Sequence, residues 1–146
     1  MSKIIHQIWL GPKAPPKWCM DSWRIDYIKN NPDWKYMLWT EKEVKDLNLV
    51  NRTEYDSEPS VRGKSDILRY EILYQFGGIF IDADSLAIDP KKSLNNLIDN
   101  KSFFACREPR NKQFIANGVI YCEKGSNIIL EMINILKEKY FDLKKK

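Results

Sequence analysis

The chain has 146 residues, of which 43% are hydrophobic, 30% charged and 12% aromatic. This length fits one domain with its own core, and the apolar content excludes intrinsic disorder. No apolar run approaches the ~20 residues that span a bilayer, so we expect no transmembrane segment. Three of the 24 basic residues lie at positions 144–146, and without them 21 basic face 20 acidic residues, so the net charge falls from +4 to +1. A nearly neutral body argues against nucleic-acid binding.

We expect a single domain over residues 1–142, followed by a basic tail at 143–146. Residues 1–15 lack the layout of a signal peptide. The three cysteines are an odd number without a Cys-x-x-Cys pair, which favours neither a disulfide framework nor a zinc site. These features together predict a soluble, cytoplasmic domain.

The strongest local patterns alternate between strands and helices. Short runs of β-branched and aromatic residues predict strands, and apolar residues spaced three and four apart predict helices. Thr40 and Glu43 have the spacing of a capping box, which predicts a short helix after Thr40. Residues 52–63 are polar and lack periodicity, so we expect a surface loop there. The predicted strands are 3–10, 34–39, 79–81, 102–107 and 118–122, and the predicted longer helices are 16–31, 64–76 and 127–140.

This alternation predicts an α/β fold with a mixed, mostly parallel central sheet flanked by helices. In such sheets, ligands bind beyond the carboxyl ends of the strands. Trp9 lies near the end of the first predicted strand, and Asp82 and Asp84 follow the strand at 79–81. His6, the only histidine, lies inside the first strand, where we expect a hydrogen-bonded structural residue.

Asp82 and Asp84 directly follow a short apolar strand. One Asp-x-Asp pair is weak evidence by itself, and two solvated turn residues are the alternative. Burying a carboxylate at the end of a strand costs free energy, however, unless the charge has a partner. In an extended segment they would point to the same side with Cα atoms about 6–7 Å apart. That spacing suits one Mn²⁺ or Mg²⁺ ion, which prefers oxygen ligands and leaves positions for substrate phosphates.

Asp66 and Arg69 are neighbours on one face of the predicted helix, within one turn of its start near Ser65. A surface ion pair is the ordinary explanation of this spacing. At the start of a helix that faces a ligand, the arginine fork could also bind phosphate oxygens, and the aspartate could accept from sugar hydroxyls. The residues alone leave both interpretations open.

Several stretches together resemble one known family. The residues SDILRY at 65–70 and GGIFIDAD at 77–84 are similar to the DXD-containing sugar-binding region of glycosyltransferase family 32. The opening IIHQIWLG at 4–11 resembles the first strand of that family, and a looser similarity extends through the Asn117-Gly118 pair. Separate motifs with the expected gap make this resemblance far more specific than Asp-x-Asp alone.

The resemblance implies a GT-A nucleotide-sugar-binding fold. The implied reaction is metal-dependent transfer of a sugar from a UDP- or GDP-sugar to a carbohydrate or other hydroxyl acceptor, with retention at the anomeric carbon. A divalent cation and an arginine would stabilise the charge on the leaving diphosphate. No residue stands out as a covalent nucleophile, so the family favours a front-face, ion-pair-like route. Asn117 matches a position near the donor or acceptor sugar.

The resemblance also implies roles for the other candidate residues. Trp9 would lie against the nucleobase. Asp82 and Asp84 would hold Mn²⁺ or Mg²⁺ together with the diphosphate and ribose. Asp66 and Arg69 would contact the donor sugar and diphosphate and are, with Asp84, the expected catalytic residues.

Other functions stay open. A phosphatase resembling the haloacid dehalogenases also has an apolar strand that runs into Asp-x-Asp, with Asp82 as nucleophile and Asp84 as general acid. That interpretation needs a downstream acidic pair, and the acids after Asp84 are scattered. A module that binds a nucleotide sugar without transferring it is another alternative. Nucleic-acid binding rests only on the lysine tail and scattered aromatic residues.

Overall fold

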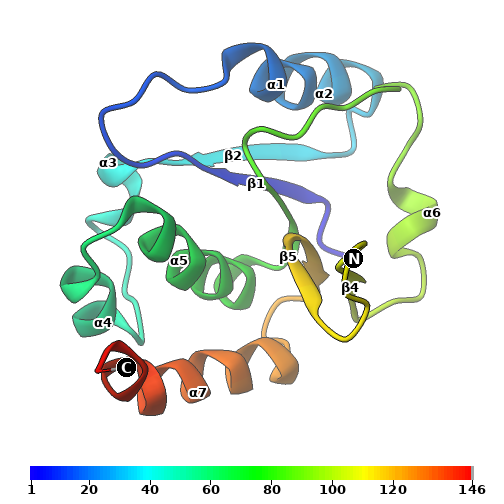
Figure 1. Cartoon of the computed structure of the whole chain (residues 1–146). Coiled ribbons are helices and arrows are strands. Elements are labelled where there is room, and N and C mark those ends of the chain that lie inside the picture. The colour runs from blue at the N-terminus through cyan, green and yellow to red at the C-terminus, as the bar shows by residue number, and fades with distance from the viewer. Residues whose placement is uncertain (146) are drawn as a thin grey trace.

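The computed structural model describes residues 1–145, in which helices and strands alternate along the chain (Figure 1). The strands are β1 (Ile4–Ile8), β2 (Lys35–Trp39), β3 (Gly78–Ile81), β4 (Phe103–Arg107) and β5 (Ile115–Cys122). They form one sheet in the order β2-β1-β3-β5-β4. β1 is parallel to β2 and β3, whereas β5 is antiparallel to β3 and β4. The expected α/β fold with a mixed sheet is confirmed.

Helices cover both faces of this sheet. The helical segments are α1 (Lys17–Asp21), the π-helical η1 (Ser22–Tyr27), α2 (Ile28–Asn30), α3 (Glu41–Val44), α4 (Arg52–Ser57), α5 (Val61–Phe76), α6 (Asn95–Ile98) and α7 (Asn127–Lys144). In Figure 1, α1 and α2 lie above the sheet, and α5 and α7 lie below it. Within residues 1–145, no helix combines the length and apolar composition that crossing a membrane requires.

The alternation of side chains along β3 divides the core between these two layers. Phe80 packs in the cluster that holds Leu68 of α5 and Ile133 of α7. Ile79 and Ile81 point to the opposite face and pack in the cluster that holds the aromatic residues of η1. Each fully buried aliphatic side chain contributes about 1.5–3 kcal/mol relative to its exposure, so both layers hold β3 in place.

His6 connects β1 to β2 and to the end of α5. Its Nδ1 accepts a hydrogen bond from Nε1 of Trp39 at 3.1 Å, so its Nε2 carries the proton and donates to the Gly77 carbonyl at 2.7 Å. Burial lowers the pKa of His6 to about 4, which keeps the ring neutral. The structure thus gives His6 the structural role that its place in a strand predicts.

The prediction of a surface loop at residues 52–63 is wrong. Residues 52–57 form α4, whose inner side buries Glu54 and Tyr55. α5 begins at Val61, earlier than expected, because the Ser60 side chain accepts from the backbone N–H of Gly63 and caps the helix. The polar composition concealed α4, since one of its two buried side chains is a carboxylate. The capping box formed by Thr40 and Glu43 at the start of α3 is present, as expected.

The end of α7 includes part of the segment expected as a basic tail. Leu143 and Lys144 lie in its last turn, and Lys146 lies outside the described residues. Lys144 Nζ is 2.8 Å from Oε2 of the buried Glu58, which also accepts from the Tyr140 hydroxyl at 2.8 Å. These contacts attach the end of α7 to the segment that leads into α5.

Candidate active site

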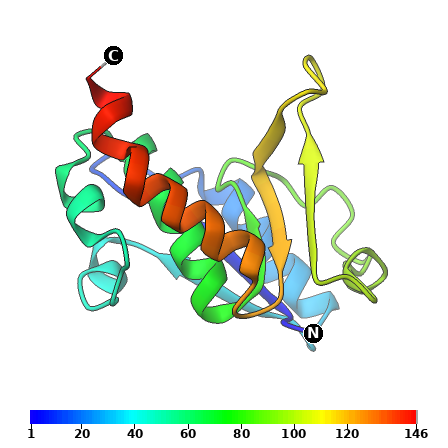
Figure 2. The same cartoon turned by 90° about the horizontal axis from the view of Figure 1, so that it is seen from below.

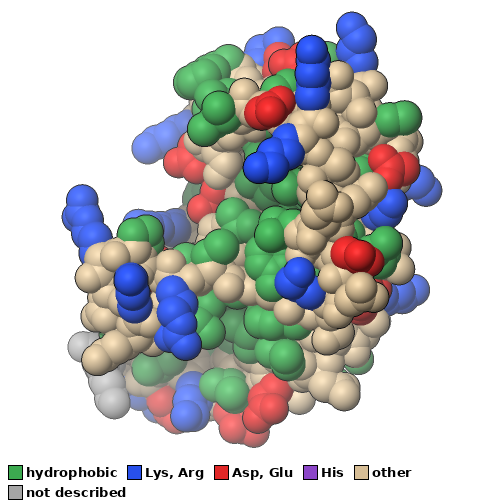
Figure 3. Space-filling model, turned by 90° about the vertical axis from the view of Figure 1, so that its right-hand side faces the viewer, with side chains coloured by type: hydrophobic (Ala, Val, Ile, Leu, Met, Phe, Trp, Pro, Cys, Tyr) green, Lys and Arg blue, Asp and Glu red, His purple; other side chains and the backbone are tan. Residues whose placement is uncertain are grey.

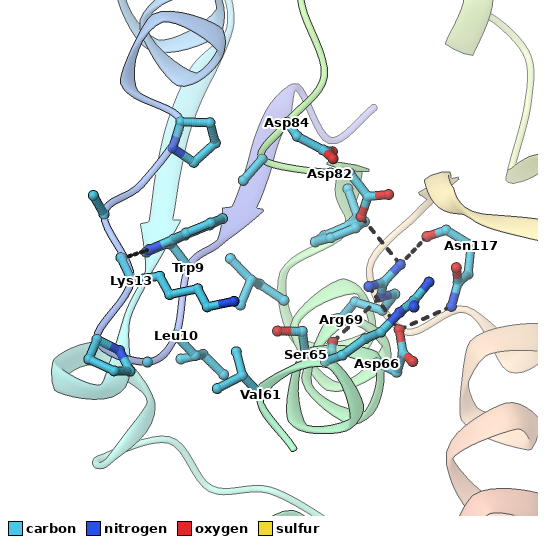
Figure 4. Close-up of a pocket in the computed structure, with 18 residues that line it drawn as sticks. Trp9, Leu10, Lys13, Val61, Ser65, Asp66, Arg69, Asp82, Asp84 and Asn117 are labelled. Atoms are coloured by element: carbon cyan, nitrogen blue, oxygen red, sulfur yellow. Dashed lines mark hydrogen bonds and ion pairs between the residues drawn. The ribbon is translucent and has the colours of Figure 1, made fainter.

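A cleft of about 810 Å³ opens beyond the carboxyl ends of β1 and β3, the edge at which ligands bind in open α/β sheets. The loop after β1 forms one wall, the first turns of α5 form the opposite wall, and the segment after β3 lies between them (Figure 4). The structure brings all the candidate residues into this cleft, although their roles remain predictions. They are Trp9, Asp66, Arg69, Asp82, Asp84 and Asn117.

Trp9 forms much of the wall on the β1 side. Its backbone N–H donates to the Trp39 carbonyl at 3.0 Å, and its indole Nε1 donates to the Lys13 carbonyl at 2.8 Å. Because the ring N–H is satisfied by its own loop, the ring face is left for apolar contact. Gly11 has φ +86°, and a Cβ there would lie 2.8 Å from Cγ2 of Val61. Glycine therefore lets this loop close against the start of α5.

Arg69 is buried at the other end of the cleft, where acceptors surround its guanidinium (Figure 4). Its Nη2 is 2.9 Å from Oδ1 of Asp66, and its Nη1 is 3.6 Å from Oδ1 of Asp82. Nη1 also donates to the Asn117 carbonyl, and the guanidinium lies 4.4 Å from the centre of the Phe80 ring. Arg69 thus joins α5, the end of β3 and the start of β5, and it positions two of the candidate carboxylates.

Asp82 is held by its backbone and by its neighbours. Its N–H donates to the Gly118 carbonyl at 2.9 Å, and its carbonyl accepts from Nε2 of Gln7 at 3.2 Å. A Cβ at Gly118 would lie 2.6 Å from Oδ2 of Asp82, so only glycine leaves room for this carboxylate. Burial raises the pKa of Asp82, and the Arg69 guanidinium opposes that increase, whereas the nearby charge of Asp84 adds to it.

The Asp-x-Asp segment is a turn, which differs from the extended geometry expected. The Ser85 N–H donates to the Asp82 carbonyl at 3.0 Å, which closes a β-turn through Ala83 and Asp84. The turn is fixed from outside, because Nε1 of Trp23 donates to the Ser85 carbonyl at 3.0 Å. Both carboxylates still line the same cleft (Figure 4).

The two carboxylates suit a hard divalent cation. The Asp82 side chain is 44% exposed, and Asp84 is exposed at the cleft. Across residues 1–145, no three Asp, Glu, His or Cys side chains gather into a closed metal site. An open pair of carboxylates fits Mn²⁺ or Mg²⁺, which take oxygen ligands and keep positions for water and phosphate. Asp82 and Asp84 would thus supply only part of the ligand set.

Two cationic side chains of the cleft were missed from the sequence. Lys13 extends into the cleft from the wall that carries Trp9 (Figure 4). Arg62 lines the opposite wall, and its charge lowers the pKa of Asp82 against the effect of burial. Arg62, Asp66 and Arg69 are spaced by four and three residues along α5, so they share one face of the helix. This pattern would have identified Arg62 if the helix start had been expected at Val61.

The chain belongs to a family of sugar-binding domains. The family model described as glycosyltransferase sugar-binding region containing DXD motif matches residues 18–104, more than half of the chain. The match includes the Asp66, Arg69, Asp82 and Asp84 positions. The chain is therefore a member of this glycosyltransferase family, as its motifs predict.

Curated proteins with similar sequences are longer than this chain. Inositol phosphoceramide mannosyltransferase 3 of Schizosaccharomyces pombe is 30% identical over 144 residues, which cover 96% of this chain and 38% of that protein. Mannosyl phosphorylinositol ceramide synthase CSH1 of Saccharomyces cerevisiae is 29% identical over 92% of this chain and 35% of its own length. Subversion of eukaryotic traffic protein A of Legionella pneumophila is 26% identical over 96% of this chain and 26% of its length.

A solved structure supports the fold. The PaToxG glycosyltransferase superposes on 96% of this chain and 60% of its own chain, with a TM-score of 0.63 and 22% sequence identity. At this identity, the similarity establishes the arrangement of the elements and leaves the substrates open.

Proposed function

We propose that this chain binds a nucleoside-diphosphate sugar in the cleft and is the donor-binding part of a glycosyltransferase. One observation carries the proposal: a single cleft combines an aromatic wall, cationic side chains and an open pair of carboxylates. These three kinds of group correspond to the base, the diphosphate and the metal ion of such a donor. Family membership supports the same function.

The order of these groups in the cleft gives the donor a direction. The base stacks on Trp9, at the wall formed by the loop after β1. The diphosphate lies in the middle of the cleft, within reach of Lys13 and Arg62. The sugar then lies toward Asp66 and Asn117, whose side chains are joined by a hydrogen bond of 3.2 Å.

The residues around Arg69 prepare the reacting end of the cleft. A bound Mn²⁺ or Mg²⁺ ion would supply Lewis-acid stabilisation of the leaving diphosphate. Arg69 holds the Asp66 and Asp82 carboxylates in place through its two terminal nitrogens. Lys13 and Arg62 add positive charge on either side of the diphosphate, where negative charge develops as the sugar leaves.

Transfer with retention is part of the proposal. Oδ1 of Asp66 already accepts from Arg69 and Asn117, and these bonds reduce the ability of the carboxylate to attack as a nucleophile. Its remaining oxygen is suited to accept from a sugar hydroxyl. The pairing of Asp66 supports a front-face route, in which the acceptor hydroxyl approaches from the side that the diphosphate leaves.

Mannose is the first sugar to test. One yeast relative is named as an inositol phosphoceramide mannosyltransferase, and the other as a mannosyl phosphorylinositol ceramide synthase. By this similarity, we propose GDP-mannose as the donor and an inositol-phosphate headgroup as the acceptor class. A cytoplasmic location is part of the same proposal.

Release of nucleoside diphosphate tests this function. The chain is incubated with GDP-mannose or UDP-glucose, with and without Mn²⁺, and with an inositol phosphate as acceptor. We expect metal-dependent release of one nucleotide, at least about tenfold slower in Asp84→Asn, whereas Asp26→Asn on the exposed side of η1 behaves as wild type. Donor binding without release would favour a binding module, and a phosphorylated aspartate would favour a phosphatase.

A further inference from the structure

The β4–β5 hairpin projects from the body of the protein on the side where the cleft opens. β5 is antiparallel to β3, and the Asp82 N–H bonds to the Gly118 carbonyl at the last step of their pairing. Residues before Asn117, which lines the cleft, therefore continue past the carboxyl end of β3. Figure 2 shows the hairpin reaching beyond the helices, with its tip at the top of the view.

The tip, defined as residues 107–115, is a loop with hydrogen bonds of its own. The Glu108 N–H donates to the Phe114 carbonyl at 2.9 Å, and the Phe114 N–H donates to the Asn111 carbonyl at 3.0 Å. Nη1 of Arg107 donates to the Lys112 carbonyl at 2.7 Å across the loop. These bonds hold the side chains of the tip on a defined support.

The tip combines exposed apolar and basic side chains. Phe114 and Ile115 are 62% and 63% exposed. Arg107, Arg110 and Lys112 are exposed beside them, and Glu108 is the acid in the same segment, which leaves a positive net charge. In Figure 3, where the hairpin projects at the left, Lys and Arg side chains stand out from its surface.

The end of α7 carries the same kinds of side chain on the same side of the molecule. Phe141 and Leu143 are 47% and 63% exposed. Lys144 and Lys145 follow them, and although they pair with Glu58 and Asp142, their side chains stay 52% and 78% exposed. In Figure 2, the C-terminal end of α7 and the hairpin tip both point to the top of the view. Two elements far apart in sequence thus present basic and apolar groups in one direction.

We propose that the hairpin tip and the end of α7 dock this chain on the surface of an anionic membrane. Apolar side chains that project from a basic surface enter the boundary between headgroups and acyl chains, while lysine and arginine pair with the lipid phosphates. A narrow projecting tip suits a lipid surface better than a protein partner, because a stable protein interface buries about 800 Å² on each side.

Docking in this orientation turns the cleft toward the bilayer. A hydroxyl on a lipid headgroup would then lie where the cleft opens and could serve as the acceptor. This role of the lipid rests on the proposed function. Membrane binding itself requires no turnover, so the docking proposal does not depend on transferase activity. The two proposals can therefore fail separately.

Vesicle sedimentation tests the docking surface. Wild-type chain is mixed with vesicles of phosphatidylcholine alone and of phosphatidylcholine with phosphatidylserine, at low and at physiological salt. We expect binding to the anionic vesicles, weakened by salt, and little binding to the neutral ones. The variant Phe114→Ser with Ile115→Ser should bind at least about tenfold more weakly, and Arg110→Gln with Lys112→Gln should lose most of the dependence on anionic lipid.

Ile25→Ser is the matched control, because Ile25 is 52% exposed on η1, away from the hairpin. It should bind vesicles as wild type does, and all variants should keep the wild-type melting temperature. Failure of wild type to bind anionic vesicles at low salt would overturn the proposal, and so would a tip variant that binds like Ile25→Ser. If the tip variants lost turnover on a soluble acceptor but still bound vesicles as wild type does, the tip would instead contact a saccharide. That result would also overturn the docking proposal.

Discussion

At the scale of single residues, the candidate site depends on the contacts that fix the Asp82 carboxylate. Its carboxylate contacts the Arg69 guanidinium on one side and the glycine at position 118 on the other. The backbone of Gly118 is not in the left-handed region, so alanine can adopt it, and the obstacle is the Asp82 side chain alone. A substitution at position 118 can therefore move the carboxylate of Asp82 without changing the stability of β5.

Gly118→Ala tests the placement of the Asp82 carboxylate. The added Cβ would lie 2.6 Å from Oδ2, so the carboxylate must turn away from its position beside Arg69. A displacement of about 1 Å at a reacting centre can cost about 100-fold in rate. We expect metal-dependent donor binding to weaken by at least about tenfold, with a melting temperature close to that of wild type. Wild-type donor affinity in the variant would show that Asp82 does not touch the bound group.

Substitutions at Trp9 separate stacking from loop closure. Trp9→Ala removes both the ring and its hydrogen bond to the Lys13 carbonyl, whereas Trp9→Phe keeps an aromatic face and loses only the hydrogen bond. Stacking of a base on an aromatic side chain contributes about 1–3 kcal/mol. We expect calorimetry to show nucleotide binding weakened about tenfold or more in Trp9→Ala and much less in Trp9→Phe. Because stacking stabilises ground and transition states equally, the rate at saturating donor should change less than the Kd. An unchanged Kd in Trp9→Ala would remove Trp9 from the site.

Part of the site could be predicted at this scale, and part could not. Asp82 and Asp84 were identifiable because two carboxylates follow directly on an apolar strand, and this placement does not depend on the exact backbone geometry. The β-turn at Ala83 has no comparable signal, since the bond from Trp23 to Ser85 that fixes it crosses between distant elements. Lys13 follows a Gly-Pro pair in a loop, where no periodicity marks the direction of a side chain.

At the scale of elements, β1 is coupled to its neighbours through a neutral histidine. The His6 ring accepts from Trp39 on β2 and donates to the carbonyl of Gly77 at the end of α5. A proton on Nδ1 would face the indole N–H of Trp39, and both groups would then be donors. Acidification is therefore expected to loosen the junction of β1, β2 and α5.

The pH dependence of unfolding tests this coupling. The pKa of His6 is about 4 in the folded chain and near its ordinary value of 6.5 in the unfolded chain. Between these values the unfolded state binds more protons, so the free energy of unfolding decreases as the pH falls. The full change corresponds to about 3 kcal/mol. Urea unfolding between pH 7 and pH 4.5 should show most of this decrease in wild type and a much flatter dependence in His6→Gln. The same slope in both proteins would contradict the assignment.

A second contribution at lower pH has a different origin. The ion pair with Lys144, together with hydrogen bonds from Ser60 and Tyr140, lowers the pKa of Glu58 to about 2 despite its burial. This stabilisation is present above pH 4.5 and is lost as the pH falls toward 2. It affects the attachment of α7, so it is separable from the His6 effect by its pH range.

The elements that could be predicted are those whose buried residues follow a simple spacing in the sequence. β3 and the middle of α5 are rich in buried aliphatic residues, and their spacing gives their type directly. α4 was missed because it is short and buries Glu54, whose charge resembles that of a solvated loop residue. β5 begins at Ile115, before its predicted start, because the hairpin extends beyond the core and its first residues are exposed.

At the scale of the whole molecule, the cleft, the hairpin tip and the end of α7 share one direction. The parallel strands β1 and β3 place Trp9 and the Asp82–Asp84 turn at one edge of the sheet. The antiparallel strands β4 and β5 extend from the same edge and form the projecting tip. The mixed sheet therefore combines a binding edge with a protruding hairpin.

Calorimetric titration of the chain with GDP-mannose, with and without Mn²⁺, tests most directly whether the cleft holds a metal–diphosphate group. We expect binding that requires Mn²⁺, is at least about tenfold weaker in Asp84→Asn, and is unchanged in Asp26→Asn. A parallel titration with a UDP-sugar covers the other donor class. Donor binding of equal strength with and without Mn²⁺, or equal strength in Asp84→Asn and Asp26→Asn, would contradict the account.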